Sequence, residues 1–308
     1  MKQFKKSIIL IIFVALVGLG VYTIIHGNVR APDAKGKLAV TASYYPLYDF
    51  AQEVGGAHVA VTNVTPAGAE PHDYEPSPQA LSRAQTSKVF IYNGGQLEPW
   101  TSSFVGDYKG IAIKASQGMP LRVSADADDA SKQVTDPHFW LDPVLAEQMV
   151  VAIQHGLRQA DPTHAHYYAQ RATAYINQLK QLDHDFANGL AQCQTRTIIT
   201  SHAAFGYLGA RYHLNVLSIA GLSPDQDPSP GKLAELSQTV RADHIHYIFF
   251  ESLVSPRLAD TIATETGAKT LVFDPLEGLS DESQKQGKNY LSVQHDNLAN
   301  LRTALACQ

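Results

Sequence analysis

The sequence predicts an α/β fold: two lobes of parallel-sheet βα units, joined by a single long backbone helix. Three observations support this prediction. Short apolar segments alternate with helical periodicities along most of the chain, which is typical of parallel sheets. The 308 residues are 44% hydrophobic, enough for one large or two medium cores. One apolar stripe near the middle of the chain continues for longer than a small domain needs.

Residues 37–160 make up the first predicted lobe, in which strands and helices alternate. Apolar runs predict the strands, and apolar positions at steps of three and four predict the helices. Ser77-Pro78 and Asp142-Pro143 each supply a helix N-cap followed by a first-turn proline. The strands are expected at 38–42, 59–64 and 88–92, and the helices at 46–54, 77–84 and 142–159.

Residues 161–193 are predicted to form the linker helix. Asp161-Pro162 repeats the capping pattern, and no further proline occurs before Gln192. At 1.5 Å per residue the helix reaches about 46 Å. A partner-binding amphipathic helix is one interpretation, but a helix packed against both lobes explains its length and its stripe together. The stripe recurs at steps of 4, 3, 4, 3 and 4: Tyr168, Ala172, Tyr175, Leu179, Leu182 and Phe186.

Residues 194–308 form the second predicted lobe, where the α/β pattern resumes after the linker. Ser229 is the expected N-cap of one helix. The strands are expected at 197–200, 215–218, 246–250 and 270–273, and the helices at 231–241 and 256–266. His202, Glu251 and Asp274 all follow the carboxyl ends of these strands. In open α/β sheets this edge is where ligands bind.

Three histidines and one aspartate recur at nearly regular intervals. His72, His138, His202 and Asp274 are separated by 66, 64 and 72 residues. A repeating α/β fold brings one side chain per unit to one edge, and a metal needs several donors within about 2.0–2.2 Å. Three imidazoles and a carboxylate suit Zn²⁺ better than Mg²⁺ or Ca²⁺, which prefer oxygen ligands. Glu70 and Glu251 compete with Asp274 for the fourth position.

The N-terminus predicts a membrane segment. Lys2, Lys5 and Lys6 precede residues 7–25, a charge-free run that would form a helix of about 28 Å. Because this run is longer than the usual signal-peptide core and no A-x-A site follows closely, we expect an uncleaved anchor in the cell membrane. A secreted or periplasmic protein after signal cleavage is the alternative. Residues 26–36 are then a short tether.

Composition and motifs argue against two classes of protein. The net charge is 24 − 29 = −5, and no Lys/Arg cluster follows the N-terminus, so nucleic acid is not an expected partner. The chain has no H-E-x-x-H or G-x-S-x-G motif, so we expect no enzyme activity. A zinc-dependent hydrolase is retained as a less favoured hypothesis.

Two cysteines, Cys193 and Cys307, would lie in a compartment where disulfides persist. Spacing alone does not establish whether they pair or whether Cys307, next to the C-terminus, stays free. Both arrangements are therefore open.

Six motifs occur in order along the chain: PHDYEPSP (71–78), DPHFWLDP (136–143), TSHAAFGYL (200–208), GLSPDQDPSPGKLAEL (221–236), IFFESLVSP (248–256) and FDPL (273–276). In this order they resemble the zinc and manganese solute-binding proteins of bacterial ABC importers (the zinc-uptake and treponemal-type cluster), and the resemblance covers Leu38 to the C-terminus. The resemblance implies two similar lobes with one metal in the cleft between them. It implies that His72, His138, His202 and Asp274 bind the metal, with Glu251 supporting a ligand imidazole.

The same resemblance implies a function. We expect an extracytoplasmic, monomeric zinc-binding protein that delivers the metal to an ABC permease and its ATPase. Manganese-specialised relatives replace the third histidine by glutamate, so His202 favours Zn²⁺, although some relatives with histidine handle Mn²⁺ as well. A manganese-binding protein of the same type, or a surface adhesin, would also fit these motifs. The acidic segment 124–135 contains no histidine, unlike the zinc-gathering loop of many relatives.

Overall fold

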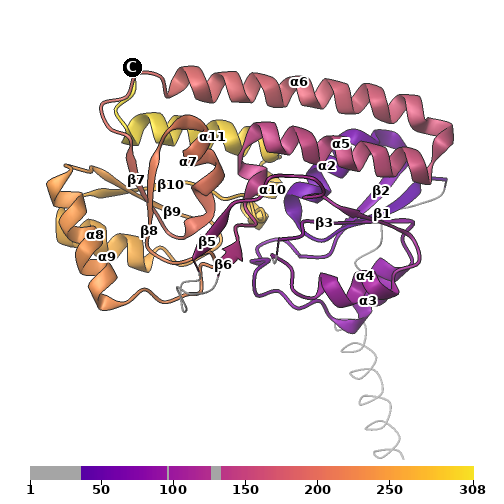
Figure 1. The fold of residues 1–308 in the computed structure, drawn as a ribbon, viewed down its shortest axis with the longest axis horizontal. Coiled ribbons are helices and arrows are strands. Elements are labelled where there is room, and N and C mark those ends of the chain that lie inside the picture. Colours follow the sequence, from indigo (N-terminus) through magenta and orange to yellow (C-terminus); the bar gives the residue numbers. More distant parts are fainter. Residues whose placement is uncertain (1–35, 96, 126–132) are drawn as a thin grey trace, which may run out of the picture. The chain divides into compact units, whose positions relative to one another are not determined.

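The first lobe is built on a four-stranded parallel sheet with the strand order β2-β1-β3-β4. The computed structural model describes residues 36–95, 97–125 and 133–308 (Figure 1). The three strands expected from the sequence are present, and β4, which was not expected, forms one edge. The four strands are β1 (Leu38–Ala42), β2 (Val59–Asn63), β3 (Val89–Tyr92) and β4 (Ile111–Lys114).

Helices of the first lobe begin where the sequence predicts a cap. The Ser77 side chain accepts a hydrogen bond from the Ala80 amide, and Asp142 accepts from the amides of Val144 and Leu145. Each cap satisfies amides that lack a partner within the helix. The helices are α2 (Tyr45–Gly55), α3 (Pro78–Gln85), α4 (Thr101–Asp107) and α5 (Pro143–Ala160). An antiparallel pair, β5 (Val123–Ala125) and β6 (Gln133–Thr135), lies between β4 and α5 in the chain.

The linker is one helix, α6 (Ala165–Gly189), shorter than the sequence predicts. All six residues of the expected apolar stripe are buried. Pro162 begins a separate 3₁₀ turn because the Asp161 carboxylate accepts hydrogen bonds from the His164 and Tyr168 side chains and caps no amide of α6. At 1.5 Å per residue α6 is about 37 Å long. It packs against α2 and α5 of the first lobe and against the C-terminal helix α11 (Tyr290–Ala304) of the second (Figure 1).

The second lobe contains two parallel strand pairs, with β7 close to β9. His202 lies two residues beyond β7, Glu251 directly follows β9, and Asp274 lies two residues beyond β10, as expected from the sequence. The strands are β7 (Thr197–Thr200), β8 (Asn215–Ser218), β9 (Tyr247–Phe250) and β10 (Lys269–Val272). Helices besides α11 are α7 (Gly206–Tyr212), α8 (Pro230–Ala242), α9 (Arg257–Thr266) and α10 (Asp281–Lys285).

A shared hydrophobic core joins the two lobes. One continuous cluster of buried side chains includes Phe50 of α2, Met149 of α5, Leu179 of α6 and Leu301 of α11. Aromatic contacts extend it: Phe50 packs against Tyr290 with ring centroids 4.8 Å apart. Because close-packed interiors resist deformation, this core limits relative movement of the lobes.

None of the helices in the described part of the chain has the length and hydropathy needed to cross a bilayer. The apolar run at residues 7–25 lies outside the described residues.

A disulfide between Cys193 and Cys307 connects the segment after α6 with the segment after α11. Of the two arrangements left open by the sequence, pairing is the one present. The two segments also share backbone hydrogen bonds, from the Gln194 amide to the Leu305 carbonyl and from the Gln308 amide to the Gln192 carbonyl. The C-terminus is therefore held against the linker.

Replacing both cysteines by alanine should lower the free energy of unfolding by about 4 to 5 kcal/mol, because the crosslink closes a long loop in the unfolded chain. The sequence separation is 114 residues. Urea denaturation of the double variant against the oxidised wild type measures the difference. Equal denaturation midpoints and slopes would contradict this expectation.

Candidate metal centre

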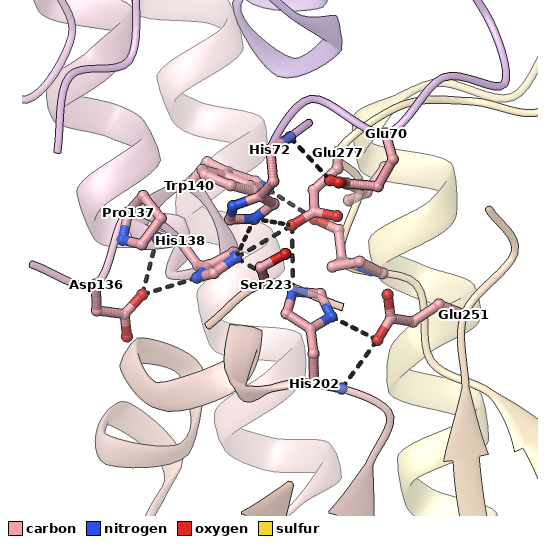
Figure 2. Close-up of polar contacts among 12 residues, drawn as sticks. Glu70, His72, Asp136, Pro137, His138, Trp140, His202, Ser223, Glu251 and Glu277 are labelled. Carbon is pink, nitrogen blue, oxygen red and sulfur yellow. Dashed lines mark hydrogen bonds and ion pairs between the residues drawn. The ribbon is translucent and has the colours of Figure 1, made fainter. Parts of the chain in front are cut away.

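Three of the four side chains predicted as ligands meet between the lobes, each carried by a different loop (Figure 2). His72 lies in the loop that leads from β2 to α3, and His138 immediately precedes the 3₁₀ turn Phe139–Leu141. His202 follows β7. The imidazoles of His138 and His202 are fully buried, whereas the His72 side chain is 9% exposed. The site is thus closed on most sides and nearest to solvent at His72.

A fourth side chain, Glu277, completes the group. Its Oε1 atom lies 3.2 Å from Nε2 of His72, 3.1 Å from Nε2 of His138 and 3.3 Å from Nε2 of His202. The His138 Nε2 atom also lies 3.2 Å from the Nε2 atoms of both His72 and His202. All four donor atoms therefore surround one small volume.

The spacing of these donors matches a tetrahedral zinc site. Metal–donor bonds of about 2.0–2.1 Å at tetrahedral angles place neighbouring donors about 3.3 Å apart. Five of the six donor separations, those given above, are 3.1–3.3 Å. The group can accept an ion of this size after only small shifts.

Two histidines are oriented by carboxylates on their far nitrogens. The Nδ1 atom of His138 lies 2.9 Å from Oδ1 of Asp136, and Nδ1 of His202 lies 2.6 Å from Oε1 of Glu251. The same oxygens accept hydrogen bonds from the backbone amides of His138 and His202. Such pairs fix the imidazole tautomer so that Nε2 presents its lone pair to the site. Glu251 makes the contact expected from the sequence, and Asp136 was not foreseen.

Buried charges shift the pKa values within the group. Burial raises the pKa of Glu277, but the three imidazoles, His202 foremost, outweigh it and hold that pKa well below its usual range. Burial lowers the pKa of His202, but the carboxylates of Glu251 and Glu277 outweigh it and raise that pKa well above its usual value. Burial dominates at His72, whose pKa is lowered. With no metal bound, these shifts favour a protonated His202 beside an anionic Glu277.

Asp274, the expected fourth ligand, does not join the group. Its Oδ2 accepts a hydrogen bond from the Ser252 hydroxyl, and its Oδ1 accepts from the Leu276 amide at 2.7 Å. Its backbone amide and carbonyl both bond to the Asn297 side chain. Burial raises the pKa of this carboxyl to about 6. The hydrogen bonds of this carboxylate stabilise the loop that follows it.

That loop explains why Glu277 is the residue that reaches the histidines. Leu276 adopts a left-handed conformation with φ of 59°, uncommon for a residue other than glycine, and this turns the chain between Asp274 and Glu277. A glutamate directly after the FDPL motif was the only available signal in the sequence. The local turn that makes it useful was not predictable.

Glu70, which also competed for the fourth position, lies beside the group. Its Oε1 accepts a hydrogen bond from the His72 amide at 3.2 Å. Burial and the nearby Glu277 raise its pKa to about 8. Its carboxylate clusters with those of Asp73 and Asp225 and is not among the four converging donors.

Comparison with known proteins places the chain in a family. Residues 40–304 match the model of the family described as zinc-uptake complex component A, periplasmic (ZnuA). The chain belongs to this family.

Relatives and solved structures agree with that membership. The chain is 35% identical over 285 residues to the high-affinity zinc uptake system protein ZnuA of Bacillus subtilis, covering 89% of each chain. It is 38% identical over 280 residues to the zinc-binding lipoprotein AdcA of Streptococcus pneumoniae, but these are 87% of this chain and only 56% of AdcA. The Zn(II)-bound ZnuA-like domain of that AdcA superposes with a TM-score of 0.76 at 38% identity, covering 88% of this chain and 99% of that one. This family member therefore has the two-lobe α/β fold.

Proposed function

We propose that this family member is an extracytoplasmic zinc-binding protein that delivers zinc to an ABC importer. The observation that carries the proposal is the convergence of three imidazole nitrogens and one carboxylate oxygen at tetrahedral spacing in a buried site between the lobes. The names of its relatives, a zinc-uptake protein and a zinc-binding lipoprotein, support the choice of metal and process.

The proposed ligands are His72, His138, His202 and Glu277. Four protein donors close the coordination sphere, whereas a catalytic zinc keeps one position open for water. The bound ion is then cargo, and we propose that the protein is not an enzyme. Zn²⁺ is preferred over Mn²⁺ because three nitrogen donors suit the softer ion and divalent affinities rise from manganese toward zinc.

The partners follow from this role. We propose that the protein passes zinc to a membrane permease driven by an ATPase, acts as a monomer, and is held at the membrane by residues 7–25. The charge-free run behind Lys2, Lys5 and Lys6 supports the anchor. In this proposal residues 37–160 and 194–308 are the two lobes, and the helix within 161–193 restricts their movement. Zinc leaves by small tilts or by a shift of the loop that carries Glu277.

Metal analysis tests the proposal directly. The protein purified without added metal should contain about one zinc per chain by elemental analysis, and excess Mn²⁺ should not displace it. A dialysed sample loaded with either metal alone gives the comparison. Absence of zinc binding, or displacement of zinc by equimolar manganese, would refute a zinc-specific function.

Zinc binding should release protons at pH 7. The raised pKa of His202 favours its protonated form in the metal-free group, and an imidazole must lose that proton to bind zinc. Lowering the pH fills more imidazoles with protons, so affinity should fall from pH 7 to pH 5, about tenfold per pH unit for each proton released. Titration calorimetry in two buffers of different ionisation enthalpy counts the protons. Equal affinities at pH 5 and pH 7 would contradict the expectation.

A further inference from the structure

Trp140 lies beside His72 and His138, two residues after His138 in the chain (Figure 2). Its side chain is fully buried. The ring meets Tyr44 edge-on at 5.0 Å between centroids and lies 5.2 Å from the imidazole of His138. The Tyr290 hydroxyl donates a hydrogen bond of 2.5 Å to the Trp140 carbonyl. The Tyr44 and His138 rings restrain the indole, and the Tyr290 bond restrains the backbone that carries it.

The indole N–H of Trp140, in the first lobe, forms a hydrogen bond with the second lobe. It donates a hydrogen bond of 2.7 Å to the carbonyl of Pro275, which lies two residues before Glu277. A buried indole N–H needs an acceptor, since leaving it unpaired costs free energy. One hydrogen bond therefore connects a position two residues from His138 with a position two residues from Glu277.

This hydrogen bond lies close to Glu277, the proposed ligand that follows a residue with a strained backbone. Leu276, between Pro275 and Glu277, is buried and has φ of 59°. Such a conformation is kept where several surrounding contacts hold it in place. The Asp274 carboxylate holds the Leu276 amide on one side, and the Trp140 indole holds the Pro275 carbonyl on the other. The carboxylate of Glu277 is thereby presented 3.1 Å from His138, although the two residues are 139 positions apart.

We propose that Trp140 is a positioning residue for Glu277, acting through the Pro275 carbonyl, and that zinc release requires this hydrogen bond to break. The inference rests on the proposed zinc function. Through this hydrogen bond, Trp140 connects the loop that carries Glu277 to the segment that carries His138. When the bond breaks, Glu277 can withdraw while the three histidines stay in place.

The test is a double-mutant cycle. Trp140→Phe keeps a buried aromatic ring and removes the N–H, so zinc should transfer to a chromophoric chelator about tenfold faster than from wild type, as expected for one lost hydrogen bond. In a Glu277→Gln background, Trp140→Phe should change the zinc dissociation rate by less than about twofold, because the residue it positions is already lost.

Two further variants control the cycle. Trp100→Phe makes the same chemical change beside Phe90 and Phe104 in the first lobe and should leave the rate unchanged. Tyr290→Phe removes the bond to the Trp140 carbonyl, so it should accelerate release in the same direction and also lose its effect in the Glu277→Gln background. It serves as an independent test should Trp140→Phe fold poorly.

The outcomes separate this inference from the proposed function. If wild type binds zinc but Trp140→Phe releases it at the wild-type rate, the positioning role is refuted. A full effect of Trp140→Phe in the Glu277→Gln background would also refute it, because the indole would then act by general packing. If wild type binds no zinc, the proposed function fails and this inference with it.

Discussion

Replacing His202 by alanine should weaken zinc binding by more than about 100-fold. Loss of a residue that merely supports a ligand typically costs about 10–100-fold in metal affinity, so loss of a ligand should cost more. His202 contributes one of the four converging donors, and its far nitrogen is fixed by Glu251. Competition against a chelator of known affinity measures the change.

A matched substitution distinguishes ligand loss from a general effect. His155, exposed on α5, can be replaced by alanine with no expected change in zinc affinity. Thermal melting of both metal-free variants shows whether they are folded. If His202→Ala retained zinc as tightly as His155→Ala, the proposed site would be wrong.

Two conservative amide substitutions should differ sharply in effect. Glu277→Gln removes the only carboxylate among the four donors and should weaken zinc binding by more than about 100-fold. Asp274→Asn should cost less than about tenfold, because asparagine can still accept from the Leu276 amide and bond with the Ser252 hydroxyl. Each change removes one charge and keeps the size of the side chain, so charge alone does not explain a difference.

The ranking of the two variants decides the fourth ligand. Calorimetry at pH 7, with wild type in parallel, gives both affinities. A larger loss for Asp274→Asn than for Glu277→Gln would restore the aspartate expected from the sequence. Equal, small losses would mean that the three histidines bind zinc without a carboxylate.

Local signals in the sequence predicted much of the fold. Ser77, Asp142 and Ser229 each cap a helix, because a short polar side chain before a proline satisfies the first amides within one turn. The six-residue stripe of α6 is buried because residues at steps of three and four share one helix face. His202, Glu251 and Asp274 lie just beyond the carboxyl ends of β7, β9 and β10, as the predicted strands imply.

Sequence patterns mispredicted the start of a helix where the expected capping residue had other hydrogen-bond partners. Asp161-Pro162 has the same form as Asp142-Pro143, yet Asp161 bonds to the His164 and Tyr168 side chains and α6 begins at Ala165. The edge strand β4 was not predicted; in it Ile113 is buried and Lys114 is exposed.

By itself, the sequence determined the α/β class and the linker helix, which depend on local periodicity, and its motifs singled out the three histidines that converge in the structure. Only the tertiary structure decided the fourth donor, the cysteine pairing and the partners of the indole N–H. Asp274 and Glu277 are three residues apart and both acidic, so no local pattern chooses between them. Contacts from distant parts of the chain decide between them. Ser252 and Asn297 form hydrogen bonds with Asp274, and Trp140 forms one with the turn that presents Glu277.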